Sequence, residues 1–150
     1  MPLSNTFNTE KALTSTLTRL SRRWCAQLNE ELKETGLSQS RLNILLCLSH
    51  HGEGVAQKDI AEHIGVKPPT IGRLLDSLEE MRLVTRPRSP DDRRVRTVYL
   101  TPAARSYCMQ AEKISAKLRH KALSGLTSDS LEDCLAVFNE VLINLDGGNP

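Results

Sequence analysis

The spacing of apolar residues changes near residue 83, and this change limits the folds open to the chain. Through most of the sequence apolar side chains recur every three or four positions, the period of an amphipathic helix. On either side of the polar turn SPDD, in the segments LVTRPR and VRTVYL, apolar and polar residues alternate instead. Such alternation predicts two strands joined as a β-hairpin. We therefore expect a fold that is mainly α with one small β element.

The composition agrees with a helical core. Phe, Trp and Tyr make up only 3% of the chain, so Leu, Ile, Val and Ala must fill the interior, which favours helices over a β-sandwich or barrel. No apolar run reaches the roughly 18 residues that a membrane span needs. The start, MPLSNTFNTEK, lacks the order of a signal peptide, and the four cysteines form no CxxC pair. These features predict a cytoplasmic protein with reduced thiols.

Turn residues separate the helical segments. Long helices are expected over residues 9–34, 101–118 and 131–145, and shorter ones after residue 38, over 57–64 and after residue 67. The expected ends come from glycine stops, polar N-caps and first-turn prolines: Gly36 and Gly65, Ser38 and Thr101, and Pro68, Pro69 and Pro102.

The two short helices around Gly65 have the pattern of a helix-turn-helix. Ala61 is small where two helices would cross, and Ile71 is the first apolar residue of the second helix. An α-helix fits the major groove of DNA, so the second helix would enter it with its N-terminal residues first. The hairpin that follows is basic, since residues 82–96 contain six arginines and two aspartates. Such a concentrated positive charge favours nucleic acid as the partner.

The chain resembles the MarR/SlyA family of winged helix-turn-helix transcriptional regulators from about residue 10 to residue 145. The resemblance is carried by the segments QKDIAEHIGV, TIGRLLDSLEEMRLV and DDRRVRTVYLTPAA. It departs at Arg82, where the family often has glycine. It implies a single MarR-type domain over 1–150, with a winged helix-turn-helix core at about 36–100 and flanking dimerisation helices at about 9–35 and 101–146.

This resemblance implies a homodimeric regulator, expected to be a repressor, that binds a pseudo-palindromic operator in double-stranded DNA. It places Arg94 in the minor groove and makes Asp92 the residue that holds the wing tip in place by hydrogen bonding. From side-chain chemistry, Arg73 is expected to pair with guanine, and Thr70 to reach a base edge or a phosphate. The expected DNA-contacting residues are Lys58, Lys67, Thr70, Arg73, Ser77, Arg86, Arg88, Asp92, Arg93, Arg94 and Arg96.

An effector site is also expected, because the resembling family accepts small aromatic acids between its first helices and the winged core. Trp24, Arg41 and His51 would suit a planar anion there, although they would equally serve as surface or dimer-core residues. Cys25 is the candidate for an alternative, an oxidant-sensing regulator. A buried structural thiol is the competing interpretation for all four cysteines.

Two histidines and a cysteine have the spacing of metal ligands. Cys47, His50 and His51 lie at i, i+3 and i+4, and His63 is not far along the chain. The helix dipole alone also favours histidines at a helix C-terminus, and no carboxylate completes the spacing. The sequence analysis therefore predicts no metal site and no cofactor.

Other classes of function have less support. The sequence contains no paired catalytic carboxylates, no supported Ser-His-Asp set and no Gly-rich phosphate loop, so no catalytic residues and no enzyme activity are expected. A winged module used only for protein–protein contact would not need an arginine at the wing tip. The presence of Arg94 therefore favours a DNA-binding module over a protein-binding one. Single-stranded RNA is usually read by aromatic stacking, which the scarcity of aromatics disfavours.

Overall fold

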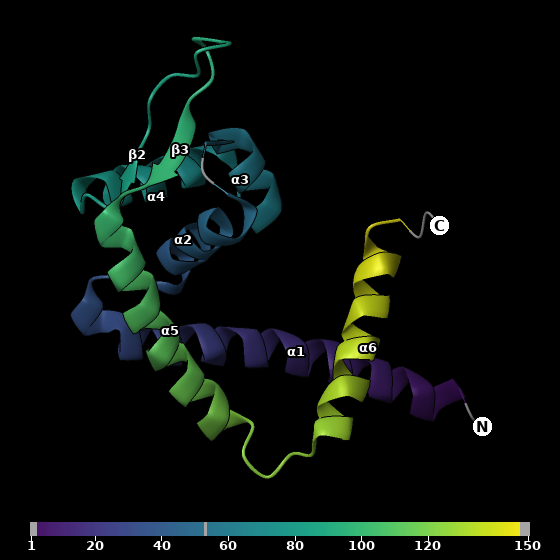
Figure 1. Cartoon of the computed structure of the whole chain (residues 1–150). Helices are drawn as coiled ribbons and strands as arrows, with labels where there is room; N and C mark the ends of the chain where they lie inside the picture. Colours follow the sequence, from purple (N-terminus) through teal and green to yellow (C-terminus); the bar gives the residue numbers. More distant parts are fainter. Residues whose placement is uncertain (1–2, 53, 148–150) are drawn as a thin grey trace. The chain divides into compact units, whose positions relative to one another are not determined.

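The computed structural model describes residues 3–52 and 54–147, which form helices and one small sheet (Figure 1). The chain divides into two compact units, Met1–Ser115 and Ala116–Pro150. In the part of the chain that is described, no helix is long and apolar enough to cross a membrane. The elements are α1 (Leu3–Leu32), η1 (Lys33–Thr35), α2 (Gln39–His51), β1 (Val55–Ala56), α3 (Gln57–Ile64), α4 (Pro68–Glu80), β2 (Val84–Thr85), β3 (Thr97–Leu100), α5 (Pro102–Ala122) and α6 (Ser128–Leu145).

Local signals set several helix ends. Gly36 and Gly65 adopt the left-handed conformation, with φ of 73° and 77°, and end η1 and α3. The Ser38 hydroxyl accepts a hydrogen bond from the amide of Arg41 at 3.3 Å and caps α2. The predicted helix at 57–64 and the Ser38 cap are confirmed, whereas α1 begins at Leu3 and not at residue 9.

The sheet has three antiparallel strands in the order β1-β3-β2. Val84 pairs with Leu100, which confirms the predicted hairpin, and Val55 pairs with Val98. The strand β1 was not predicted, because two residues are too few to show alternation. The two strands of the hairpin are shorter than the alternating segments of the sequence. Beyond the strands, the two arms of the hairpin are joined by an isolated bridge between Arg88 and Arg96.

The core lies where α2, α3 and α4 meet the sheet, and aliphatic side chains fill it as predicted. This arrangement, mainly helical with a β-wing after a helix-turn-helix, confirms the predicted fold class. The largest fully buried side chains are Leu32, Ile44, Leu45, Leu48, Ile60, Ile71, Leu75, Leu78, Leu83, Val84 and Val98.

The helices outside this core leave many apolar side chains at the surface of the single chain. The helix α6 has no buried residue at all, although its sequence is amphipathic. The outer part of α1 also exposes the predicted stripe of Leu13, Leu17 and Leu20. The other exposed large apolar residues are Phe7, Met109, Leu123, Leu126, Leu135, Val137, Leu142, Ile143 and Leu145.

Candidate nucleic-acid interface

The helix-turn-helix is formed by α3 and α4 with a short turn between them. Ala61 is 4% exposed, so the predicted close crossing is present. Its carbonyl accepts hydrogen bonds from Gly65 and Val66 at 2.9 and 3.0 Å, which reverses the chain at the end of α3. Ile71 is buried at the start of α4. The opposite side of α4 therefore faces outward from its first turn onward.

Three of the predicted DNA-contacting residues lie on this outer side of α4. The Arg73 side chain is exposed, whereas Thr70 and Ser77 are half-buried. Gly72 lies beside them, and a Cβ added there would have only the Gln57 amide nitrogen nearby, at 3.9 Å. The helix thus presents one long cationic side chain, Arg73, and beside it the backbone at Gly72 is not covered by a side chain of its own.

The wing is tied to this helix pair through the backbone. The amide of Gln57, the first residue of α3, donates to the carbonyl of Arg96 at 3.1 Å. The amide of Gly54 donates to the carbonyl of Val98 at 3.0 Å. Gly54 has φ of 81°, a conformation that favours glycine, and a Cβ there would lie 2.9 Å from the Tyr99 hydroxyl, which would have to shift. These contacts fix the base of the wing beside α3.

A tight turn closes the wing tip. The Asp92 carboxylate accepts a hydrogen bond from the backbone amide of Arg94 at 2.9 Å, and the Asp92 carbonyl accepts one from Val95 at 2.9 Å. The amide of Ser89 donates to the carbonyl of Val95 at 2.8 Å and brings the two arms together. Asp92 thus holds the tip through the backbone of Arg94 and leaves the Arg94 side chain exposed.

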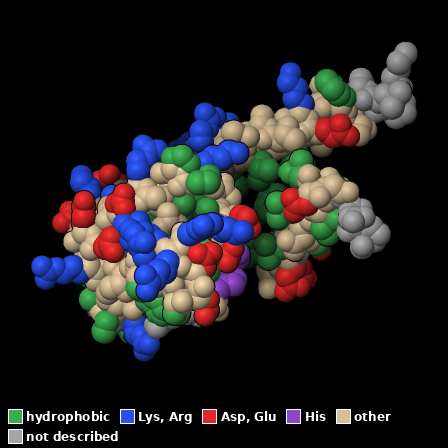
Figure 2. Space-filling view, turned by 90° about the horizontal axis from the view of Figure 1, so that it is seen from above, with side chains coloured by type: hydrophobic (Ala, Val, Ile, Leu, Met, Phe, Trp, Pro, Cys, Tyr) green, Lys and Arg blue, Asp and Glu red, His purple; other side chains and the backbone are tan. Residues whose placement is uncertain are grey.

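Cationic residues from α3 and the wing line one surface hollow. Lys58, Arg94 and Arg96 border it together with Glu62 of α3, and Pro68 and Ile71 of α4 form part of its wall. The hollow has a volume of about 620 Å³. Figure 2 looks onto the end of the molecule where the wing projects, and Lys and Arg side chains are spread over that face with Asp and Glu among them. Lys67, Arg88 and Arg93 are exposed as well.

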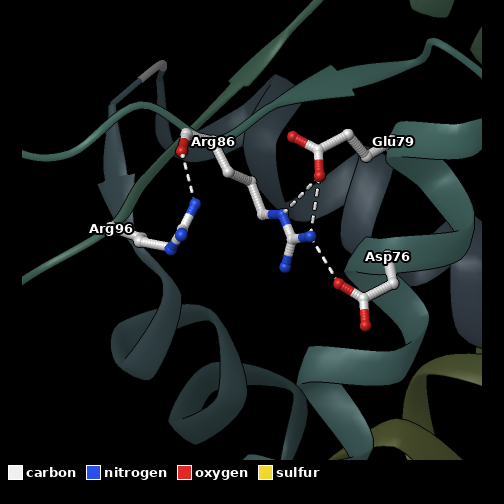
Figure 3. Close-up of polar contacts among 4 residues, drawn as sticks. All are labelled: Asp76, Glu79, Arg86 and Arg96. Carbon is white, nitrogen blue, oxygen red and sulfur yellow. Dashed lines mark hydrogen bonds and ion pairs between the residues drawn. The ribbon is translucent and has the colours of Figure 1, made fainter.

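Figure 3 shows Arg86 beside Glu79 and Asp76, while Arg96 donates from Nη1 to the Arg86 carbonyl at 3.3 Å. The Arg86 Nε and Nη2 donate to the Glu79 carboxylate at 3.3 and 2.7 Å, and Nη2 also pairs with Asp76. The Arg86 side chain is only 11% exposed. Burial lowers the pKa of this guanidinium, but hydrogen bonds and attraction from the two carboxylates outweigh it and raise the pKa overall.

This ion-pair cluster changes the interpretation of three residues. Arg86 remains a predicted phosphate ligand, but its Nε and Nη2 also pair with Glu79 and Asp76, which ties the segment after β2 to α4. The sequence analysis gave Asp76 and Glu79 no role. They lie three residues apart on the outer side of α4, which is a pattern shared by many solvated helices, so no sequence signal singled them out.

Arg82, where the chain departs from the family pattern, has a left-handed backbone with φ of 58°. Its amide donates to the Glu79 carbonyl at 2.9 Å, and Leu83 donates to Leu78 at 2.9 Å, which ends α4. Glycine adopts this conformation without steric cost, which explains the family preference. The Thr101 hydroxyl donates to the Arg82 carbonyl at 2.7 Å, a contact that the expected N-cap role of Thr101 did not anticipate.

The predicted effector residues have different surroundings in the described chain. Arg41 is half-buried: its Nη1 donates to the Gly36 carbonyl at 3.0 Å, and its Nε is buried without a partner among the described residues. Trp24 is half-buried on α1. His51 lines a separate pocket, to which neither Trp24 nor Arg41 contributes.

The cysteines are all unpaired thiols. Burial raises the pKa of Cys47 and of Cys108, which lowers their thiolate content at neutral pH and makes both poor oxidant sensors. Cys25, the predicted redox candidate, is half-buried on α1.

Comparison with known proteins places this geometry in a family. The family model described as "MarR family" matches residues 37–95. The transcriptional regulator PA3341 is 36% identical, with a TM-score of 0.79 over 89% of this chain and 98% of that chain. BldR from Sulfolobus solfataricus is 27% identical, with a TM-score of 0.83 over 92% and 97% of the two chains. The repressor CouR, solved on a 23-mer DNA duplex, is 27% identical, with a TM-score of 0.77 over 89% and 94%.

Proposed function

The chain belongs to the MarR family of transcriptional regulators, and from this premise we propose that it acts in the cytoplasm as a homodimeric repressor without enzymatic activity. Each chain of the dimer inserts α4 into a major groove and its wing into the adjacent minor groove. Because the two recognition helices are related by two-fold symmetry, the operator is a pseudo-palindrome with half-sites about one helical turn apart.

The observation that carries the DNA-binding proposal is the shared hollow of α3, α4 and the wing. Lys58, Arg94 and Arg96 border it from two elements that are far apart in sequence. Arg94 is exposed at the wing tip, and Asp92 holds the backbone of that tip in a turn. The backbone there is therefore already ordered before DNA binds. CouR, at 27% identity, has been solved with a DNA duplex, which supports the same partner here.

The homodimer proposal rests on α1 and α6. The helix α6 buries no side chain within one chain, and Leu135 and Leu142 are 60% and 57% exposed. Leu20 of α1 is 56% exposed. Exposed apolar residues repeated along a helix mark an interaction site, and a second copy is the occupant that two-fold operators require.

Selection of bound genomic fragments by the purified full-length protein tests the function. We expect one enriched pseudo-palindromic motif upstream of a small number of genes, and an affinity that falls steeply as salt rises, since released counterions drive phosphate binding. Absence of an enriched motif together with a flat salt response would instead favour a winged module that binds protein.

We also propose that the effector is a small aromatic acid whose carboxylate binds Arg41. The Arg41 Nε is buried without a partner among the described residues, and a carboxylate oxygen would supply one. Trp24 is the single tryptophan, so fluorescence excited selectively over the two tyrosines reports on its surroundings. Benzoate is expected to change this fluorescence and release the operator, while benzamide, its neutral analogue, leaves both unchanged. Equal responses to the two compounds, or unaltered binding in Arg41→Gln, would contradict the proposal.

A further inference from the structure

Three side chains with metal-binding atoms meet outside the DNA-binding surface, at the junction of α2 and α3. Ligand atoms of Cys47, His51 and His63 all lie within 4.8 Å of one another. No metal site was predicted from these residue types, because the helix dipole accounts for the two histidines at 50 and 51 and no carboxylate completes the spacing. Packing of α3 against α2 supplies the third side chain, His63.

The backbone holds two of the ligands in register. Cys47 and His51 are one turn apart on α2, with the Cys47 Sγ 4.0 Å from the His51 Nδ1. That Nδ1 also lies 3.1 Å from the Cys47 carbonyl oxygen. When this Nδ1–H donates to the carbonyl, the Nε2 nitrogen of His51 is the one that binds the ion, an arrangement common among metal-binding histidines.

The third ligand comes from the first helix of the helix-turn-helix. His63 is in the last turn of α3, and its ring lies 4.3 Å from that of His51 between centroids, at an interplanar angle of 65°. A favourable helix dipole explains the histidines at the end of α2. It does not explain why Cys47 of the same helix and His63 of α3 lie next to His51. The convergence itself therefore points to a shared ligand.

The surroundings leave room for an ion. A pocket of about 390 Å³ opens beside the cluster, lined also by Asn43, Leu46, His50 and Ile64. In a tetrahedral zinc site, bonds of about 2.3 Å to sulfur and 2.0 Å to nitrogen place the ligand atoms roughly 3.3–3.6 Å apart. The ligand atoms must therefore approach one another by roughly 1.2–1.5 Å at most, which the exposed His51 and His63 side chains can do around the buried Cys47.

We propose that Cys47, His51 and His63 bind a soft divalent transition-metal ion such as Zn²⁺, with solvent from the pocket as the fourth ligand. One thiolate and two imidazoles favour zinc and its neighbours over Mg²⁺ or Ca²⁺, which take oxygen ligands. A bound ion links α2 to α3 and so stabilises the folded chain in proportion to its occupancy.

Metal titration of the full-length protein, stripped with a chelator, tests the site. We expect one Zn²⁺ per chain in competition with a chromophoric chelator, a higher melting temperature with Zn²⁺, and reversal by EDTA. Co²⁺ in place of Zn²⁺ is expected to give a thiolate-to-cobalt charge-transfer band, which Cys47→Ser removes. His63→Gln and His51→Gln are each expected to weaken Zn²⁺ binding at least tenfold, because each removes one of three protein ligands.

Matched controls come from the same chain. His120 is exposed on α5 and Cys134 is exposed on α6, so His120→Gln and Cys134→Ser are expected to leave metal binding unchanged. Because His51 and His63 are exposed, their variants retain the fold even if Cys47→Ser does not, and far-UV circular dichroism checks this. The proposal is wrong if Zn²⁺ does not bind at micromolar concentration, if His63→Gln binds as tightly as His120→Gln, or if Co²⁺ gives no thiolate band.

Discussion

The carboxylate of Asp92 accepts a hydrogen bond from the backbone amide of Arg94, with 2.9 Å between Oδ1 and N. The contact spans two residues and closes the wing tip without using the Arg94 side chain. An arginine on a preset turn loses less conformational freedom on entering a groove than one on an open loop. This relationship separates the roles of two nearby charged residues. Asp92 shapes the backbone of the wing tip, and the side chain of Arg94 is left exposed.

Removal of the Arg94 side chain is expected to weaken operator binding more than tenfold. A groove-bound arginine is worth roughly 1–3 kcal/mol, and loss of one phosphate-neutralising charge reduces the salt slope by about 0.9. Fluorescence anisotropy of Arg94→Ala across a salt series measures both quantities, and light scattering checks that the dimer persists. Lys113→Ala, which removes an exposed cation on α5, serves as the control. Unchanged affinity would remove the wing from the mechanism.

Asp92→Ala is expected to weaken operator binding by roughly fivefold, the equivalent of about 1 kcal/mol for one lost hydrogen bond. Asp92→Asn keeps an acceptor oxygen, so it should restore most of the affinity even though it makes the wing more positive. An opposite order, with Asn as weak as Ala, would mean that the charge of Asp92 matters and its hydrogen bond does not. The same anisotropy assay distinguishes these cases.

Arg86→Met is expected to affect stability more than the salt dependence of DNA binding. The variant keeps the buried apolar stem but leaves Asp76 and Glu79 without their cation. Both carboxylates are well exposed, so solvent screening limits the loss to about 1 kcal/mol, or roughly 2–4 °C in melting temperature. Arg88→Met is the matched variant. A lower salt slope in Arg86→Met than in Arg88→Met would restore Arg86 as a phosphate ligand.

Arg82→Gly is expected to stabilise the protein. Arg82 has φ of 58°, and a non-glycine residue in this conformation costs about 1 kcal/mol. Glycine also increases the conformational entropy of the unfolded chain. The net gain in the free energy of unfolding is therefore expected to be a fraction of that value. Thermal unfolding should show a small rise in melting temperature, and Arg82→Ala should not show it. A fall in Arg82→Gly would mean that the arginine side chain makes a stabilising contact.

Aspartate at Leu135 and Leu142 of α6 is expected to convert the dimer into a monomer. Neither side chain is buried within one chain, so the substitutions cost the single-chain fold little, whereas charges buried at an apolar interface are strongly unfavourable. Light scattering coupled to gel filtration measures the mass, with Glu132→Lys on the same helix as control. A double variant that remains dimeric would place the interface elsewhere.

Local residue chemistry accounts for the parts of this protein that could be predicted from the sequence. Gly65 ends α3 because glycine accepts a left-handed backbone, and Ser38 caps α2 through the amide of Arg41, only three residues away. The hairpin followed from alternation, and its arginines were visible as a run. Each of these signals acts over a few residues, so it can be read before the chain folds.

Contacts between distant segments could not be predicted in this way. Arg86 resembles the other wing arginines in sequence, but packing of β2 beside α4 places it between Asp76 and Glu79, where it forms ion pairs that the sequence did not indicate. The strand β1 exists only because Val98 offers it a partner.

The sequence alone therefore determined several helix ends, the wing and the family pattern, since these depend on backbone preferences and short-range periodicity. The tertiary structure decided which charges pair, which apolar stripes stay exposed for a partner, and that His63 joins Cys47 and His51. The physical reason is that side-chain pairing and burial depend on distances in space, which packing sets.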